Sequence, residues 1–272
     1  MSEEKICGID ATWLLHRAHH SMSAHRVTMI VNWICGYAMQ TRSTHMAVCF
    51  DTGKSFRYDL FKDYKANRHK LAEGEEPPTS DANDYYDELR NTLDILRIPV
   101  VTKLTLEADD LLATIGHQAP RAVLVSKDKD QLQGLSKTCT IMQPGVMGNP
   151  DVFIDLPTFI KSWGITPAQF LDVQTLMGDK TDNIPPLLTP AVAKKLVLKY
   201  GSIKAWMNSG KEPPTREFIQ RMQLNRKLVK MLTNCFEFDM DKFKIPLAPR
   251  TPTKISKYLE MVNSVGKKSL FG

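Results

Sequence analysis

The 272-residue sequence has no apolar run of about 18 residues, and no cationic stretch precedes an apolar one at its N-terminus. The first absence excludes a membrane-spanning helix of ordinary length, and the second argues against an export signal. We therefore expect a cytoplasmic protein with no membrane partner.

Cysteine pairs of the CxxC type are also absent. The five cysteines are scattered and odd in number: Cys7, Cys35, Cys49, Cys139 and Cys235. This pattern excludes a disulfide framework and favours reduced core residues. His16 and His20 are spaced for a zinc pair, but no third ligand accompanies them, so zinc is not favoured.

A phosphate-binding loop of the nucleotide-hydrolase type is missing as well. The closest match, Gly266-Lys-Lys-Ser269, has Met261 where the motif requires its first glycine. The composition is otherwise that of a soluble globular protein, with 42% hydrophobic and 24% charged residues. A net charge of +6 favours an anionic partner, and nucleic acid is one candidate.

Three acids stand together at the start of an apolar stretch that predicts a helix through about Gln118: Glu107, Asp109 and Asp110. One acid in a first helical turn needs no further explanation, because the helix N-terminus carries partial positive charge. Asp109 lies roughly 200° around the helix from Glu107, so the three converge only if the cluster straddles the junction of loop and helix. A solvated acidic helix start is the plainer alternative.

Further acids follow predicted strands or lie at element junctions. The apolar runs 5–9, 44–50 and 121–126 predict buried strands, and Asp10, Asp51, Asp128, Asp130, Asp179 and Asp182 follow these strands or other element ends. Strands alternate with helical stretches, which predicts an α/β fold with a mostly parallel central sheet. Ligand sites in such sheets gather at the carboxyl ends of the strands.

Nine acids in one site would repel one another unless cations or raised pKa values offset their charge. Ligands that are all hard oxygens predict Mg²⁺ or Mn²⁺. Two such ions, about 3.5–4 Å apart, activate water and stabilise the leaving oxygen of a phosphodiester.

Basic and aromatic residues alternate over positions 54–68, a mixture that suits phosphate pairing and base stacking. The basic residues are Lys54, Arg57, Lys62, Lys65 and Arg68, and the aromatic ones are Phe56, Tyr58, Phe61 and Tyr64.

Six blocks of the sequence occur in the order found in a known family. They are Gly8-Ile-Asp10, Phe50-Asp51, Tyr64-Lys-Ala-Asn-Arg68, Glu107-Ala-Asp-Asp110, Ser126-Lys-Asp-Lys-Asp130 and Gly178-Asp-Lys-Thr-Asp-Asn-Ile-Pro185. Through them, about residues 5–207 resemble the 5′-nuclease family of flap endonucleases and 5′–3′ exonucleases. That family includes the nuclease domain of bacterial DNA polymerase I and free-standing phage enzymes. With no polymerase attached, the chain looks most like the phage type, which places it in a bacterial or phage-infected cell.

The resemblance implies roles for individual residues. Asp10, Asp51, Glu107, Asp109 and Asp110 would bind or orient one metal ion, and Asp128, Asp130, Asp179 and Asp182 a second ion or the water between. Lys65 and Arg68 would hold the scissile phosphate, Tyr64 would stack on a terminal base, and Arg17 would contact the substrate. A plain surface cation is the alternative for Arg17.

The resemblance also implies an organisation. We expect a PIN-like nuclease domain over residues 1–155 with an arch at about 54–80, a helical DNA-binding region over 156–265 and a flexible tail over 266–272. The helical region would contain a degenerate helix-hairpin-helix motif, because residues 185–190 have none of the glycines usual there. Duplex binding is then expected to shift to Lys194, Lys195 and Lys199.

The predicted function is a monomeric, Mg²⁺-dependent 5′ nuclease of DNA replication that acts on DNA with a 5′ flap, nick or end, or on an RNA–DNA hybrid. Leu270 and Phe271 in the tail resemble the peptides that dock on a sliding clamp, and an incidental apolar pair is the alternative. Two other functions stay open: an acid-rich ribonuclease of related architecture, and a nucleic-acid-binding replication accessory whose site has decayed.

Overall fold

The structure is a computed structural model, and it describes residues 4–20, 25–66, 81–146, 148–211 and 213–245. Three predictions lie outside these residues: the phosphate contact of Arg68, residues 67–80 of the arch predicted at about 54–80, and the clamp-binding tail at 266–272.

The described residues build a central sheet of six strands in the order β3-β2-β1-β4-β5-β6. Strands β1 to β5 pair in parallel, and β6 runs antiparallel to β5. Their bounds are β1 Ile6–Asp10, β2 His45–Cys49, β3 Val100–Val101, β4 Ala122–Val125, β5 Cys139–Gln143 and β6 Val152–Ile154. The predicted α/β fold with a mostly parallel sheet is therefore confirmed, although the short strand β6 was not predicted.

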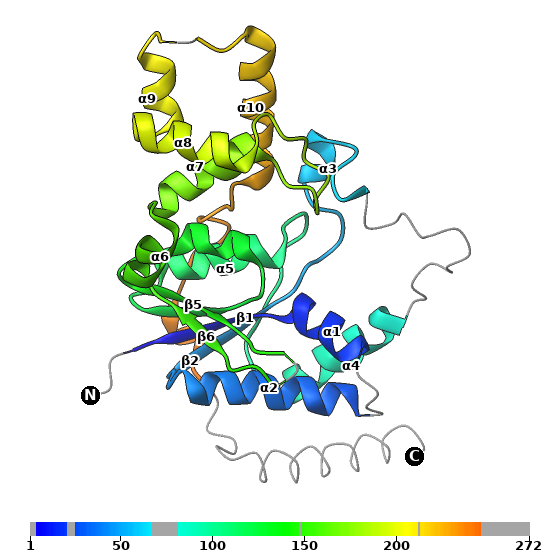
Figure 1. Cartoon of the computed structure of the whole chain (residues 1–272). Helices are drawn as coiled ribbons and strands as arrows, with labels where there is room; N and C mark the ends of the chain where they lie inside the picture. The colour runs from blue at the N-terminus through cyan, green and yellow to red at the C-terminus, as the bar shows by residue number, and fades with distance from the viewer. Residues whose placement is uncertain (1–3, 21–24, 67–80, 147, 212, 246–272) are drawn as a thin grey trace, which may run out of the picture.

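Helices cover both faces of the sheet and extend beyond it (Figure 1). On one face lie α1 Ala11–His19, α2 Arg26–Gln40 and α4 Asp81–Ile95, and on the other lie α5 Ala108–Gln118 and α6 Leu156–Trp163. A helical extension contains α7 Pro167–Met177, α8 Pro190–Tyr200, α9 Ile203–Asn208 and α10 Arg216–Val229, with the short α3 Arg57–Leu60 beside α10. Two 3-10 helices, η2 Lys129–Gly134 and η3 Met240–Phe243, complete the described elements.

Alternation along the strands explains why helices cover both faces. In β1, Ile6 packs into the core beneath α5, whereas Cys7 and Ile9 pack into the core beneath α1, α2 and α4. Gly8 faces α5, and a methyl group there would come within 2.9 Å of Leu112 and Leu124. Both faces are thus fully buried, as continuous apolar strands in a parallel sheet require.

The core beneath α5 continues into the helical extension. Phe159 of α6, Phe170 of α7, Trp206 of α9 and Met222 of α10 belong to one buried apolar cluster with the sheet. The helical region that begins at Leu156 therefore packs on the same core as the sheet. The helix-hairpin-helix motif expected within it stays a prediction.

Gly178 ends α7 and directs the chain toward Asp179. Its φ of 65° and ψ of −166° lie in a region that only glycine occupies readily, and a Cβ there would lie 2.4 Å from the carbonyl oxygen of Ile184. Gly164, which ends α6, has φ 66° and ψ 16° and no atom within 4 Å of such a Cβ. A side chain at Gly164 would therefore meet backbone strain alone, whereas a side chain at Gly178 would meet both backbone strain and a steric clash.

We expect Gly164→Ala to reduce the free energy of unfolding by about 1 kcal/mol. Gly178→Ala should reduce it by more than about 2 kcal/mol, because the turn before Asp179 has no room for the methyl group. Urea unfolding in EDTA measures both. Equal losses in the two variants would contradict this account of the turn.

Candidate active site

The carboxyl ends of β1 and β4 lie side by side at the point where the strand order reverses, which is where open parallel sheets bind ligands. Asp10 is the last residue of β1 and caps α1, since its Oδ1 accepts the Trp13 N–H at 3.0 Å. The Ser126 hydroxyl, just after β4, donates to Asp10 Oδ2 at 3.1 Å. These bonds hold the Asp10 carboxylate at the sheet edge.

Asp51 and Asp109 reach the same edge through the start of α5. The Ala108 N–H donates to Asp51 Oδ1 at 2.5 Å, which joins the end of β2 to the first turn of this helix. Glu107 is the N-cap of α5, and Asp109 and Asp110 lie in its first turn. The acidic cluster therefore straddles the junction of loop and helix, as predicted.

A cavity of about 290 Å³ opens between these acids. Its walls carry four of the predicted acids together with one predicted cation: Asp10, Asp51, Asp109, Asp128 and Lys65. Asp128 enters as the N-cap of η2, where its Oδ1 accepts the Asp130 N–H at 2.8 Å. Thr12, Trp13, His16 and Lys127 also line the cavity, and the sequence patterns gave them no role in catalysis.

A second group of acids surrounds Asp130. Asp179 accepts hydrogen bonds from the Lys129 ammonium at 2.8 Å and from the Thr181 N–H at 2.7 Å, which hold it against η2. Asp182 Oδ2 accepts from the Tyr64 hydroxyl at 3.0 Å. The nearby acids Asp128, Asp179 and Asp182 all raise the pKa of Asp130, so this group adjoins the cavity through Asp128.

Burial and mutual repulsion perturb both groups of acids. Burial, together with Asp51 and Asp128, raises the pKa of Asp10 to about 7. Burial and the neighbouring acids raise the pKa of Asp130 to about 8, and for the same reasons the pKa values of Asp109 and Asp128 are also raised. At Asp179, burial acts to raise the pKa, but the Lys129 ammonium and the N–H groups of Thr181 and Asp182 together outweigh it, so the pKa is lowered.

These residues fit a divalent cation by their chemistry. The donors are carboxylate oxygens, which Mg²⁺ and Mn²⁺ prefer, and their raised pKa values show that their negative charges lack sufficient compensation. In the part of the chain that the structure describes, no three His, Cys, Asp or Glu side chains stand close enough together to hold a metal ion. The donor set is thus suited to a cation, but the acids are not drawn together around one position.

Two of the predicted metal ligands instead face Arg57. The Arg57 guanidinium donates to both oxygens of Asp110, at 2.7 and 2.8 Å, and to Glu107 at 3.0 Å. Asp110 is 0% exposed, and its Oδ1 also accepts the Leu232 N–H at 2.9 Å. The predicted role of Asp110, to bind or orient a metal ion, stays a prediction, and in this structure its oxygens are committed to Arg57 and to the backbone.

Tyr64 and Lys65 lie at the base of the predicted arch. Tyr64 is 2% exposed, and its hydroxyl donates to Glu107 at 3.1 Å as well as to Asp182. The predicted stacking of Tyr64 on a terminal base stays a prediction, and in this structure its ring is buried against Tyr58. The Lys65 ammonium pairs with Glu107 at the wall of the cavity, where a phosphate group would reach it.

Arg17 is packed between aromatic side chains. Its guanidinium lies 5.3 Å from the Trp13 ring centroid and 4.4 Å from that of Trp33, and it donates to the Tyr37 hydroxyl at 3.1 Å. This environment favours a packing role for Arg17 over the predicted contact with the substrate.

Several backbone N–H groups of the segment after Asp182 are either missing or already bonded. The N–H groups of Leu187 and Leu188 both donate to the Leu176 carbonyl, at 2.9 and 3.0 Å, and the prolines have none. On α8, Lys195 and Lys199 are exposed and Lys194 is half-buried.

Three buried or half-buried glutamines support the acids, and sequence reasoning missed all of them. Gln131 donates to Asp109 Oδ1 at 2.9 Å, and its own Oε1 is buried with no hydrogen-bond partner among the described residues. Gln174 donates to Asp130 Oδ1, and Gln133 donates to Gln174. A single buried glutamine leaves no repeating pattern in a sequence. The one signal that could have found these residues is that Gln131 and Gln133 lie just after an acid motif.

No helix in the described residues is long and apolar enough to cross a membrane.

The sequence of this chain is similar to those of known proteins. The family model of the 5′–3′ exonuclease N-terminal, resolvase-like domain matches residues 5–164. A 5′–3′ exonuclease of Bacillus subtilis is 28% identical over 258 residues, which cover 85% of this chain and 84% of that protein. DNA polymerase I of Rhizobium leguminosarum is 30% identical over 231 residues, or 80% of this chain, but the match spans only 22% of that longer protein.

Solved structures share the fold. The bacteriophage T5 D15 flap endonuclease, in a complex with DNA and metal ions, superposes with a TM-score of 0.66 at 20% identity, over 83% of this chain and 86% of that one. The catalytic core of Rad2 with a DNA substrate superposes with a TM-score of 0.52 at 17% identity, over 92% and 81% of the two chains. With the matching family model, these likenesses lead to one conclusion: the chain belongs to the family of 5′–3′ exonucleases, through their N-terminal, resolvase-like domain.

Proposed function

We propose that this protein is a structure-specific 5′ nuclease that hydrolyses phosphodiester bonds in DNA bearing a 5′ flap, nick or end. The observation that carries the proposal is the convergence of Asp10, Asp51, Asp109, Asp128 and Lys65 on one cavity at the sheet edge. Carboxylates beside an ammonium suit a phosphate ester that approaches with divalent cations. The chain's family membership and the flap endonuclease fold of the T5 protein support the same activity.

The cofactor we propose is Mg²⁺ or Mn²⁺, with two or more ions held by Asp10, Asp51, Asp109 and Asp128 on one side and by Asp130, Asp179 and Asp182 on the other. When bound, the cations would supply an activated water and charge stabilisation at the leaving oxygen. Glu107 acts indirectly, because its carboxylate holds Lys65 and Tyr64 in place.

Lys65 would contribute charge at the scissile phosphate. Its φ of 56° is unusual for a residue with a side chain, and its N–H donates to the Asp182 carbonyl at 2.9 Å. The backbone is thus fixed, and the ammonium is presented at the cavity wall. A phosphate group would compete with Glu107 for this ammonium.

Labelled 5′-flap DNA, an RNA–DNA hybrid and single-stranded RNA, each incubated with Mg²⁺ and with EDTA, test the activity. We expect cleavage of the flap with Mg²⁺ and none with EDTA. Cleavage confined to single-stranded RNA would instead indicate the related ribonuclease, and binding without any cleavage would indicate the replication accessory.

Replacing one acid of the cavity should separate cutting from binding. We expect Asp128→Asn, and likewise Asp130→Asn, to abolish cleavage while DNA affinity stays within about threefold, because an amide keeps the shape but not the charge. Asp94→Asn, an exposed acid on α4, serves as the control and should be fully active. A loss of binding equal to the loss of cutting would count against a catalytic role.

Lys65→Ala should slow the chemical step by roughly a hundredfold, since its charge acts mainly as negative charge builds on the phosphate. Single-turnover rates at saturating enzyme measure this step apart from affinity. Lys62→Ala, which removes an exposed cation from the same segment, should leave that rate unchanged. An affinity change alone in Lys65→Ala would refute the assignment.

The lysines of α8 should account for much of the salt dependence of duplex binding. Because the Leu187 and Leu188 amides are already bonded, we expect the logarithmic salt slope to fall by about 0.9 for each of Lys194, Lys195 and Lys199 replaced by alanine, if each contacts a phosphate. We also expect no preference for K⁺ over Na⁺ at equal ionic strength. A salt slope unchanged in the triple variant, or a clear K⁺ preference, would show that the hairpin binds DNA despite its sequence.

A further inference from the structure

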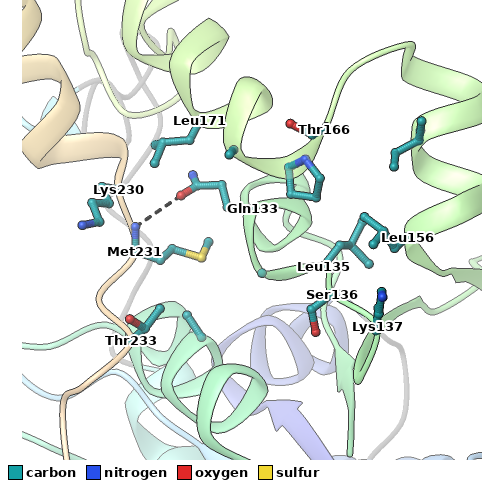
Figure 2. Close-up of a pocket in the computed structure, with 15 residues that line it drawn as sticks. Gln133, Leu135, Ser136, Lys137, Leu156, Thr166, Leu171, Lys230, Met231 and Thr233 are labelled. Carbon is teal, nitrogen blue, oxygen red and sulfur yellow. Dashed lines mark hydrogen bonds between the residues drawn. The ribbon is translucent and has the colours of Figure 1, made fainter. Parts of the chain in front are cut away.

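The chain segment that follows α10 contacts Gln133 through its backbone. The Gln133 amide nitrogen donates to the Val229 carbonyl at 2.9 Å, and its Oε1 accepts the Met231 N–H at 3.4 Å. Gln133 lies in the wall of a mainly apolar cavity of about 630 Å³, where Figure 2 shows it beside Met231.

These two backbone partners fix the orientation of the Gln133 side-chain amide. A carbonyl only accepts and an N–H only donates, so Gln133 must present its nitrogen toward Val229 and its oxygen toward Met231. The same nitrogen then donates its second hydrogen to Gln174 Oε1, at 2.8 Å. The backbone of residues 229–231 therefore sets the orientation of Gln174 as well.

Gln174 passes this orientation on to an acid of the site. With its oxygen occupied by Gln133, its nitrogen faces Asp130 and donates to Asp130 Oδ1. Gln174 is 2% exposed, so water does not offer a ready alternative partner. The result is one directed chain of hydrogen bonds: residues 229–231, Gln133, Gln174, Asp130.

We infer that Gln133 and Gln174 are positioning residues that aim the Asp130 carboxylate at its cation, and that the segment 229–231 sets them. The inference rests on the proposed function. A neutral amide suits this task, because it holds one oxygen of Asp130 without the positive charge by which a lysine would compete with the cation. The same segment secures Arg57, which donates to the Leu228 carbonyl at 2.8 Å and the Lys230 carbonyl at 3.1 Å.

This arrangement adds further residues from the part of the chain after the family match, where Asp179 and Asp182 already lie. That match ends at residue 164, whereas Gln174 and residues 229–231 lie after it. The helical extension would therefore complete the catalytic centre in addition to any contact with DNA.

Calorimetric titration of the DNA-free protein with Mn²⁺, on variants of the full chain, tests the inference. Methionine is unbranched and close in length to glutamine, so it removes the hydrogen bonds and leaves little empty space. We expect Gln174→Met to weaken Mn²⁺ binding about tenfold, and Gln133→Met to weaken it several-fold. Because the two act in series, the double variant should match Gln174→Met within about twofold.

Gln118→Met is the matched control. Gln118 donates to the Thr233 carbonyl at 3.1 Å, so it holds the chain just after residues 229–231, and among the described residues it has no hydrogen bond to an acid of the site. Its Mn²⁺ affinity should equal that of the wild type. Thermal unfolding in EDTA shows whether any variant is merely destabilised.

Two results would overturn the inference: Mn²⁺ affinities of Gln133→Met and Gln174→Met within twofold of the control, or a double variant whose effects multiply. A flap-cleavage assay at saturating Mg²⁺ distinguishes failure of the proposed nuclease function from failure of the proposed positioning role. A wild type that binds Mn²⁺ but cuts no substrate would contradict the proposed function, whereas unchanged Mn²⁺ affinity in active variants would contradict only the positioning role.

Discussion

The repulsion among buried carboxylates is the constraint on which the rest of the structure depends. Asp10, Asp51, Asp109 and Asp128 are brought to one cavity by a parallel sheet whose strand order reverses between β1 and β4. Burial and mutual charge raise the pKa values of three of them, Asp10, Asp109 and Asp128, so their ionised forms are under electrostatic strain. Divalent cations would relieve this strain, and the same cations are those that phosphodiester hydrolysis requires.

The protein offsets part of this charge with its own groups. Arg57 neutralises Asp110 and Glu107 at the start of α5, and Lys129 holds Asp179. Removing one partner of a buried pair such as Arg57 and Asp110 leaves an uncompensated charge, which typically costs about 3–5 kcal/mol. Arg57 thus commits Glu107 and Asp110 to structural contacts, whereas Asp179, although paired with Lys129, stays with the cavity acids among the residues proposed to hold cations.

Much of the fold could be predicted from the sequence, and its motifs named candidate residues for the site. Continuous apolar strands that end in acids gave the parallel sheet, and the spacing of Glu107, Asp109 and Asp110 placed them across a helix start. The sequence could not separate Asp110 from Asp109, because that difference depends on Arg57 and on Leu232, more than 50 and 120 residues away respectively. The burial of Tyr64 was not predictable for the same reason, since it depends on contacts with Glu107 and Asp182, which are distant in the sequence. Sequence motifs identify the acidic residues, whereas contacts in the folded structure determine which of their carboxylate oxygens are available to bind cations.

The most direct test of this account is the location of bound cations. Crystals grown with Mn²⁺ and measured at its absorption edge would show whether the cavity acids hold the metal. We predict anomalous peaks about 2.0–2.2 Å from carboxylate oxygens of Asp109 and Asp128, with none at Asp110. A peak beside Asp110, with Arg57 displaced, or saturating Mn²⁺ with no peak among the cavity acids, would contradict the central claim.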